Sequence, residues 1–182
     1  MSLAETNFEE LISDMGKKAR KASRALSGIS PSIKNKALEL MAEKFDRNRE
    51  RIISENQRDL DKAPEYGLTE AMVDRLRLTD QRIDGIIKAV LEIAALEDPV
   101  GALENIRVRP NGLRIGHMRA PIGVIGIIYE SRPNVTVDAG ALCMKSGNAT
   151  ILRGGKEAFH SNTILAELME QACQEAGIPE GA

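Results

Sequence analysis

The sequence predicts an α/β protein with three successive parts: N-terminal helices, a β-hairpin arm and the start of a doubly wound parallel sheet. Amphipathic helical patterns fill residues 1–104, and apolar and polar residues alternate around a Pro-Asn-Gly turn in residues 105–119. Strand and helix patterns then alternate through residues 120–182. With 182 residues, of which 42% are hydrophobic, the chain is large enough to bury a core.

The charge balance limits the kinds of partner. The chain has 25 basic and 27 acidic side chains, giving a formal net charge of -2. It therefore offers no broad electropositive face to nucleic acid or an anionic membrane, and any anion site must be local. Apolar runs such as residues 124–128 are too short to span a bilayer, and the acidic N-terminus lacks the basic and apolar parts of a secretory signal. We expect a cytoplasmic protein that binds neither nucleic acid nor membrane.

Start signals divide the first hundred residues into amphipathic helices. The predicted starts are a capping box at Thr6 and Glu9, Ser30-Pro31, Thr69, and Thr79 or Asp80. A further helix is predicted through the charged stretch 47–62. Each start precedes apolar residues at helical spacing. The first helix should be long and amphipathic, with one apolar face formed by Phe8, Leu11, Ile12, Met15, Ala19, Ala22 and Leu26.

The pattern changes to strands after the last of these helices. Alternating residues on either side of Pro110-Asn111-Gly112 predict a hairpin, either projecting or packed. The continuous apolar run from Pro121 to Ile128 is typical of a parallel strand that is covered on both faces. A helical pattern, a Gly-Asn turn and a strand at residues 149–152 follow, completing a βαβ unit. A further helix from Ala158 or Ser161 to Gly177 begins a second crossover.

Two polar segments stand at the predicted strand ends, where open α/β sheets bind their ligands. One is the turn at residues 130–134, and the other is Arg153-Gly154-Gly155-Lys156. In the second, glycines allow the backbone to approach a ligand and the cations suit a phosphate. A generic strand-to-helix turn uses glycine for the same steric reasons, so both interpretations stay open. No G-x-G-x-x-G or G-x-x-x-x-G-K-[ST] motif is present.

The cysteines and histidines give no separate site. Cys143 and Cys173 both fall in helical patterns among apolar neighbours. A free cysteine of this kind packs as a small apolar residue, and a cytoplasmic location does not favour a disulfide, so we interpret both as structural. His117 and His160 have no cysteine or carboxylate at ligand spacing, so we predict no metal site.

Several motifs together resemble a known family. Residues 129–134 read Tyr-Glu-Ser-Arg-Pro-Asn, residues 144–156 run from a Gly-Asn turn through a strand to Arg-Gly-Gly-Lys, and residues 54–60 read Ser-Glu-Asn-Gln-Arg-Asp-Leu. These motifs resemble the glutamate-5-semialdehyde dehydrogenases (gamma-glutamyl phosphate reductases) of the aldehyde dehydrogenase superfamily, over essentially the whole chain. The resemblance implies an aldehyde dehydrogenase-like fold, in which residues 120–182 begin a dinucleotide-binding domain.

The resemblance also implies roles for single residues. Asn134 matches the asparagine of the superfamily's Pro-Trp-Asn motif, whose amide donates to the oxygen of the thiohemiacetal, so it is the implied oxyanion donor. Arg153 takes the place of a lysine, and Lys156 that of a glutamate, that hold the adenosine ribose. Because lysine attracts a 2′-phosphate that glutamate would repel, we expect NADPH as the cofactor, bound by Arg153, Gly154, Gly155 and Lys156.

Alternatives remain for two residues of the first turn. Arg132 departs from the general superfamily pattern but resembles the reductases. Its guanidinium is suited to an acyl phosphate or α-carboxylate of the substrate, or equally to a structural ion pair with Glu130. Asn134 on residue type alone is also a good cap for the following helix.

The implied activity is the NADPH-dependent reduction of L-glutamyl 5-phosphate to L-glutamate 5-semialdehyde. That mechanism needs a cysteine thiolate to attack the acyl phosphate, and neither Cys143 nor Cys173 matches its position. We expect the nucleophile downstream of Ala182, so the chain is expected to be an N-terminal portion that lacks the catalytic domain and is inactive alone.

Two other functions and one structural role complete the expectations. A second aldehyde or acyl-phosphate dehydrogenase of the superfamily is one alternative, since a fold does not fix a substrate. A non-catalytic helical interaction module is the other. Residues 105–119 correspond to the superfamily's oligomerisation arm, which implies a homo-oligomer, although such a hairpin could also cover its own domain edge.

Overall fold

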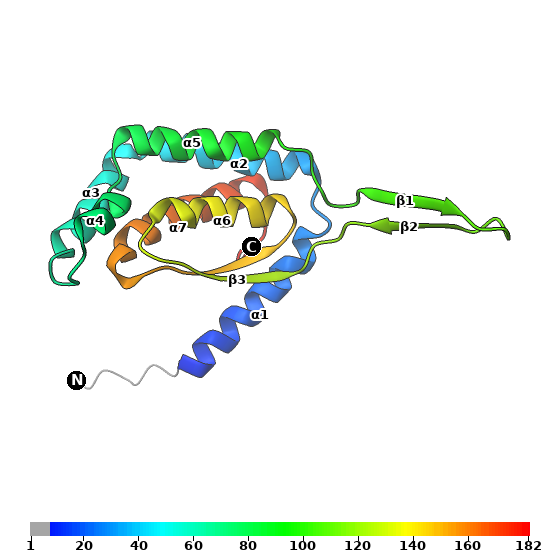
Figure 1. Ribbon diagram of the computed structural model, residues 1–182, viewed down its shortest axis with the longest axis horizontal. Coiled ribbons are helices and arrows are strands. Elements are labelled where there is room, and N and C mark those ends of the chain that lie inside the picture. Colours follow the sequence, from blue (N-terminus) through cyan, green and yellow to red (C-terminus); the bar gives the residue numbers. More distant parts are fainter. Residues whose placement is uncertain (1–7) are drawn as a thin grey trace.

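The computed structural model describes residues 8–182 and contains the expected helices and strands in the expected order (Figure 1). The predicted cap Thr6 lies outside the described residues. The elements are α1 (Phe8–Leu26), α2 (Pro31–Arg47), α3 (Arg49–Lys62), α4 (Glu70–Leu76), α5 (Asp80–Ala95), β1 (Leu103–Val108), β2 (Arg114–Met118), β3 (Val124–Ile128), α6 (Pro133–Lys145), β4 (Ala149–Arg153), η1 (Lys156–Ala158) and α7 (Phe159–Ala176).

The core forms around α2. Its apolar residues recur at helical spacing, so one face of α2 packs against α5 and another against α7 (Figure 1). Leu38 and Phe45 on this helix are completely buried, as is Val90 of α5. Ser30 precedes α2 with an extended backbone and Pro31 occupies its first turn, as the sequence predicted.

Two predicted helix caps are confirmed, and a third comes from another element. Thr69 accepts from the backbone N–H of Met72, and Thr79 accepts from that of Arg82. The first turn of α7 is instead satisfied by Asp59 of α3, whose carboxylate accepts from the Ser161 N–H at 2.7 Å and the Ser161 hydroxyl at 2.6 Å. This contact fixes α3 against α7 across the core.

The predicted βαβ unit is present. Strands β3 and β4 pair in parallel, with Val124 opposite Ala149 and Ile128 opposite Arg153, and α6 makes the crossover. The carboxyl ends of both strands therefore lie at the same edge. The expectation that β3 is covered on both faces is wrong, because Ile128 is 80% exposed. The described helices α1 and α6 pack mainly on β4.

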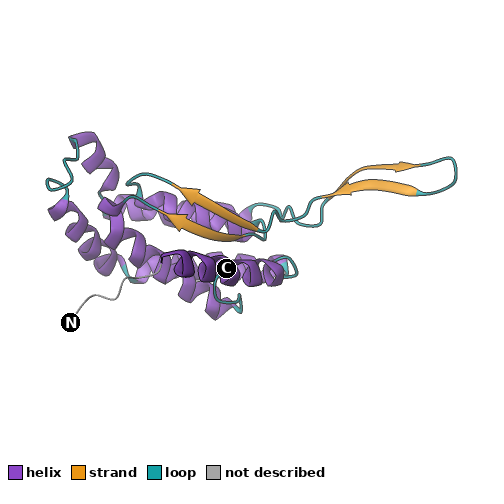
Figure 2. Cartoon of the chain, turned by 90° about the horizontal axis from the view of Figure 1, so that it is seen from below, coloured by secondary structure: helices purple, strands orange, loops and turns teal. Residues whose placement is uncertain are grey.

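The hairpin projects from the rest of the molecule. Strands β1 and β2 pair antiparallel, and every residue of both is exposed (Figures 1 and 2). The strands begin at Leu103, two residues before the predicted boundary, and Asn105 has φ 54 beside an irregularity in the register. The projecting form of the hairpin is thus the observed one.

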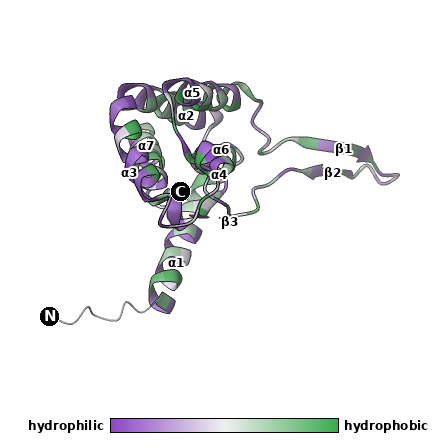
Figure 3. Cartoon of the chain, turned by 60° about the vertical axis from the view of Figure 1, so that its left-hand side comes forward, coloured by the Kyte–Doolittle hydropathy of each residue, from purple (hydrophilic) through white to green (hydrophobic). Residues whose placement is uncertain are grey.

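Helix α1 buries only part of its apolar face. Ala19, Ala22 and Leu26 lie in the core, whereas Phe8 is 73% exposed and Ile12 is 63% exposed. The first half of the helix extends away from the other helices and carries hydrophobic residues on its surface (Figure 3). The predicted amphipathic helix is therefore present, but only the second half of its apolar face is buried.

Buried charges connect α2, α6 and the segment that leads to the hairpin. Lys34 of α2 lies 2.8 Å from Asp98, and both side chains are at most 8% exposed. Lys145 at the end of α6 donates to Asn35 at 2.6 Å and to the Ala94 carbonyl at 2.9 Å. Burial lowers the pKa of Lys145 from its ordinary value. These polar contacts offset the free-energy cost of burying the charged side chains.

No helix in residues 8–182 is long and apolar enough to cross a membrane.

Candidate functional site

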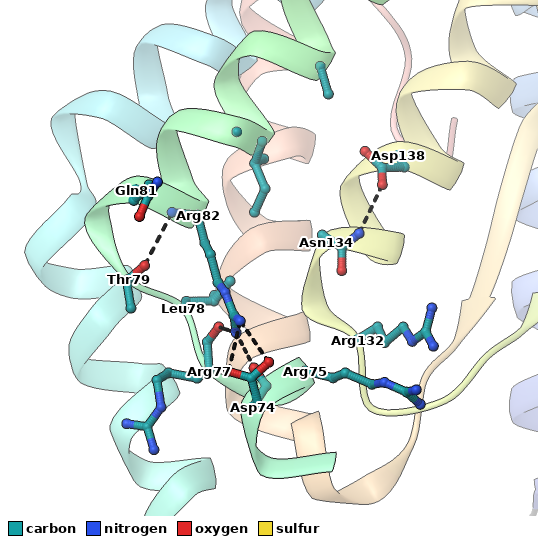
Figure 4. Close-up of a pocket in the computed structure, with 13 residues that line it drawn as sticks. Asp74, Arg75, Arg77, Leu78, Thr79, Gln81, Arg82, Arg132, Asn134 and Asp138 are labelled. Atoms are coloured by element: carbon teal, nitrogen blue, oxygen red, sulfur yellow. Dashed lines mark hydrogen bonds and ion pairs between the residues drawn. The ribbon is translucent and has the colours of Figure 1, made fainter. Parts of the chain in front are cut away.

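A cavity of about 720 Å³ lies beside α4, α5 and the first turns of α6 (Figure 4). The loop that enters α6 starts from the carboxyl end of β3, so the cavity lies where ligands bind to parallel sheets. Its lining is Asp74, Arg75, Arg77, Leu78, Thr79, Gln81, Arg82, Gly85, Ile86, Ala89, Arg132, Asn134 and Asp138.

The cavity brings together two residues that the sequence singled out, Arg132 and Asn134. Pro133 starts α6, which places both neighbours at the first turn of the helix. The Asn134 amide donates to the Asp138 carboxylate at 3.1 Å, one turn further along α6. Arg132 occupies the N-cap position and no side chain caps the helix, so the alternative in which Asn134 is the cap does not hold. The second N–H of the amide has no partner among the described residues.

Arg132 does not form the structural ion pair that was the alternative to substrate binding. Its backbone N–H donates to the Glu130 carbonyl at 2.8 Å, but its guanidinium has no hydrogen bond or ion pair with any described residue. The side chain is exposed and extends from the loop at the edge of the cavity (Figure 4). The guanidinium is therefore available to an anion.

The structure adds basic residues that the sequence did not indicate. Arg75, Arg77 and Arg82 all line the cavity. Asp74 neutralises Arg82, with both carboxylate oxygens 2.9 Å from the guanidinium. Arg75 and Arg77 have no such partner among residues 8–182. Figure 4 shows the Arg75 side chain extending to the same side as Arg132, whereas Arg77 points away from both.

Asn56 holds the segment between α4 and α5 that carries this basic group. Its amide donates to the Leu76 carbonyl at 2.8 Å and accepts from the Leu78 N–H at 2.7 Å. The side chain is 1% exposed, so these bonds are shielded from water. Asn56 and Asp59 belong to the motif at residues 54–60, on which the family resemblance partly rests.

Asp138 is the other residue that the sequence did not indicate. It is partly buried on the first turns of α6, and burial raises the pKa of its carboxyl group. The hydrogen bond from Asn134 acts in the opposite direction and offsets part of this rise. Its side-chain partner among the described residues is thus a neutral amide, even though arginines line the same cavity.

The loop of residues 153–156 lies at the same sheet edge but does not line this cavity. Arg153 ends β4 and its exposed side chain has no partner among the described residues. The Lys156 ammonium lies 5.0 Å from the centre of the Tyr66 ring, a cation–π contact. The two predicted subsites are therefore separate places at one edge of the sheet.

Neighbouring side chains lie close to the two glycines of this loop and occupy the space that a Cβ would take. A Cβ on Gly154 would overlap the Asn162 amide and lie 3.1 Å from the Tyr129 hydroxyl. That hydroxyl and the Asn162 carbonyl oxygen both bond to Thr136, which connects the two loops. A Cβ on Gly155 would overlap the Glu157 carboxylate. The close atoms at Gly155 belong to the flexible end of the Glu157 side chain, so this packing does not decide between the two interpretations of the loop.

The cysteines do not belong to the cavity. Cys143 is buried in α6, and Cys173 lies in α7, where burial and, to a lesser extent, Glu170 raise the pKa of its thiol to about 12. A thiol with this pKa is protonated at neutral pH and is a poor nucleophile. Within residues 8–182, no group of three or more histidine, cysteine, aspartate or glutamate residues could hold a metal ion.

Comparison with known proteins defines the class to which this fold and site belong. A model of the aldehyde dehydrogenase family matches residues 4–182. The chain therefore belongs to the aldehyde dehydrogenase family of oxidoreductases.

Relatives within the family are gamma-glutamyl phosphate reductases. The enzyme of that name from Halothermothrix orenii is 52% identical over 96% of this chain and 42% of its own length. The crystal structure from Thermotoga maritima is 47% identical over 92% of this chain and 41% of that one, with a TM-score of 0.89. The structure from Saccharomyces cerevisiae is 34% identical over 92% of this chain and 44% of that one, with a TM-score of 0.87. The chain thus spans well under half the length of these relatives.

Proposed function

We propose that the protein is an NADPH-dependent gamma-glutamyl phosphate reductase, in which this chain forms the dinucleotide-binding part and one wall of the substrate site. The reaction is L-glutamyl 5-phosphate plus NADPH and a proton, giving L-glutamate 5-semialdehyde, NADP⁺ and phosphate. One observation supports this most strongly. Arg132 and Asn134 line one cavity beyond the carboxyl end of β3, in a chain 52% identical to an enzyme with that name.

The cavity has the groups that an acyl phosphate needs. The free N–H of Asn134 is suited to donate to the carbonyl oxygen as negative charge develops there, which is the role of an oxyanion donor. Arg132 and Arg75 supply two unpaired guanidinium groups for the anionic parts of the substrate. No cysteine lines this cavity, so we expect the nucleophile from the part of the enzyme that the resemblance places downstream.

The loop at the end of β4 fits a phosphorylated dinucleotide. Arg153 is exposed and unpaired among the described residues, and the Lys156 ammonium lies against the Tyr66 ring without an ion pair to any residue of 8–182. We assign Arg153 to the adenosine ribose and Lys156 to the 2′-phosphate, with Gly154 and Gly155 keeping the backbone of the loop close to Asn162 and Glu157. The bound cofactor would supply the hydride that reduces the acyl group.

We also propose that the projecting hairpin joins subunits of a homo-oligomer. Its six large hydrophobic residues are all at least 42% exposed: Leu103, Ile106, Val108, Leu113, Ile115 and Met118. An exposed apolar hairpin of this kind is unfavourable in water, and pairing with another subunit would cover it.

The activity is tested most simply in the direction of semialdehyde oxidation, with the full-length protein that contains this chain. L-glutamate 5-semialdehyde, NADP⁺ and inorganic phosphate are supplied, and NADPH is followed by its absorbance. We expect turnover that requires phosphate, because phosphate is the second substrate in this direction. Identification of the acyl phosphate product completes the test.

The alternatives give different results. Oxidation that does not need phosphate and yields the free acid would identify another aldehyde dehydrogenase of the family. Phosphate-dependent oxidation of a different aldehyde would identify a different acyl-phosphate reductase. No turnover with any aldehyde, by a protein that is folded and binds no dinucleotide, would favour the interaction module.

A further inference from the structure

Asp138 is a carboxylate without a cation in a basic cavity. Arg75, Arg77, Arg82 and Arg132 line the same cavity, yet none of them forms an ion pair with Asp138. Its Oδ2 atom accepts from the Asn134 amide, and its Oδ1 atom has no partner among the described residues. Asp74, the other acid of the lining, is fully engaged with Arg82.

Without a ligand, the charged form of Asp138 has an unfavourable free energy in this cavity. Burial raises the pKa of Asp138, which means that its charged form is poorly compensated where it stands. A cationic ligand group at Oδ1 would offset this cost, whereas an arginine of the cavity does not do so. The carboxylate is therefore suited to a small positive group that arrives with the substrate.

The position of Asp138 relative to Asn134 matches one kind of substrate. The two residues are four positions apart on the same face of α6, a rise of about 6 Å. In a 5-glutamyl substrate, four bonds separate the reacting carbonyl carbon from the α-ammonium nitrogen, which is a similar span when the chain is extended. A carbonyl oxygen at Asn134 would thus leave the ammonium near Asp138.

We propose that Asp138 binds the α-ammonium group of the substrate and so makes the site selective for an α-amino acid over the same molecule without the amine. This inference rests on the proposed function for the identity of the substrate chain. It assigns to Asp138 recognition of a cation, and leaves the anionic parts of the substrate to the arginines.

The test compares L-glutamate with glutarate, which has both carboxylates but no ammonium group. Equilibrium binding of each is measured with the full-length protein that contains this chain. We expect the wild type to bind L-glutamate more tightly. Asp138→Asn keeps the size and the hydrogen-bonding capacity but removes the charge. It should weaken L-glutamate binding by about tenfold or more, while glutarate binds as well as before or better.

Two further variants make the result specific. Asp74→Asn removes the same charge from the same cavity, but its carboxylate is engaged by Arg82, so the ratio of L-glutamate to glutarate affinity should stay at the wild-type value. Asp138→Glu keeps the carboxylate and should retain part of the preference, which guards against a folding defect in Asp138→Asn.

Each remaining outcome contradicts the proposal. Equal losses for both ligands in Asp138→Asn would mean that Asp138 only orients Asn134 or supports the helix. No preference for L-glutamate in the wild type would mean that the cavity does not detect the amine. Turnover is measured separately, so an active enzyme with an unchanged ligand ratio refutes the role of Asp138 and leaves the proposed function standing.

Discussion

In the proposed site, Lys156 determines the preference for NADPH over NADH. Its ammonium contacts only the Tyr66 ring and makes no ion pair with a described residue. A 2′-phosphate near it would gain a charge-assisted contact, whereas an unphosphorylated ribose would not.

We predict that Lys156→Glu reverses this preference. The introduced carboxylate should repel the 2′-phosphate, so the affinity ratio of NADPH to NADH should fall by about tenfold or more. Titration of both cofactors with the full-length protein measures the ratio. Lys21→Glu, an equal change in charge on an exposed part of α1, is the control and should leave the ratio unchanged. An unaltered ratio in Lys156→Glu would show that this lysine does not contact the cofactor.

At the same scale, the sequence predicted Arg132 and Asn134 because they lie on one short turn at the end of a recognisable strand. Arg75 and Asp138 were not predicted, since their presence in one cavity depends on where α4 lies relative to α6 in the fold. Helical spacing shows which residues share a face of their own helix, but not which other helix that face meets. The motif at residues 54–60 carried part of this information, because Asn56 fixes the segment next to Arg75.

Among the elements, the ion pair between Lys34 and Asp98 joins α2 to the segment that leads into the hairpin. Asp98 also accepts from the Val100 N–H at 2.9 Å, so one carboxylate holds the start of that segment at two points. Nearly all of both side chains is removed from water. A pair of this kind contributes little net stability when complete, but losing one partner leaves a buried charge.

We predict that Lys34→Met lowers the free energy of unfolding by about 3 to 5 kcal/mol, because it leaves Asp98 buried and unpaired. Chemical denaturation measures the change. The exposed pair of Lys17 and Asp14 is the control, and Lys17→Met should cost no more than about 1 kcal/mol. Similar small losses in both variants would mean that water reaches Asp98 in solution.

The elements also show where local patterns are sufficient. Thr69, Thr79 and Pro31 start their helices as predicted, because a cap depends on only a few neighbouring residues. The coverage of β3 on both faces was predicted wrongly, and the apolar residues in the first half of α1 are exposed. An apolar residue indicates that a surface can be buried, but its burial also depends on elements distant in the sequence.

For the whole molecule, the hairpin is the feature that reaches furthest from the core. It extends at the end opposite α3 and α4, and it leads into β3 at the amino end of that strand (Figure 1). The cavity lies beyond the carboxyl end of β3, so the proposed subunit contact and the proposed substrate site are at opposite ends of the sheet.

We predict that Ile106→Asp combined with Met118→Asp reduces the size of the oligomer. Both side chains are at least 50% exposed, so the substitutions should leave the fold intact while they disfavour an apolar contact between subunits. Light scattering after size-exclusion chromatography measures the mass, and circular dichroism checks the helices. Leu91→Asp, on the exposed side of α5, is the control. An unchanged mass in the double variant would exclude the hairpin as the subunit contact.

The link between Asp59 and Ser161 also bears on how the chain is made. The two residues are 102 positions apart, and α2 likewise depends on α7 for one of its covered faces. While a ribosome is translating the chain, the early helices must wait for α7 to emerge before their apolar faces can be sheltered. During this interval the nascent chain exposes apolar surface. Chaperones should therefore bind most strongly before α7 is synthesised, and more weakly once α7 can pack against α2 and α3.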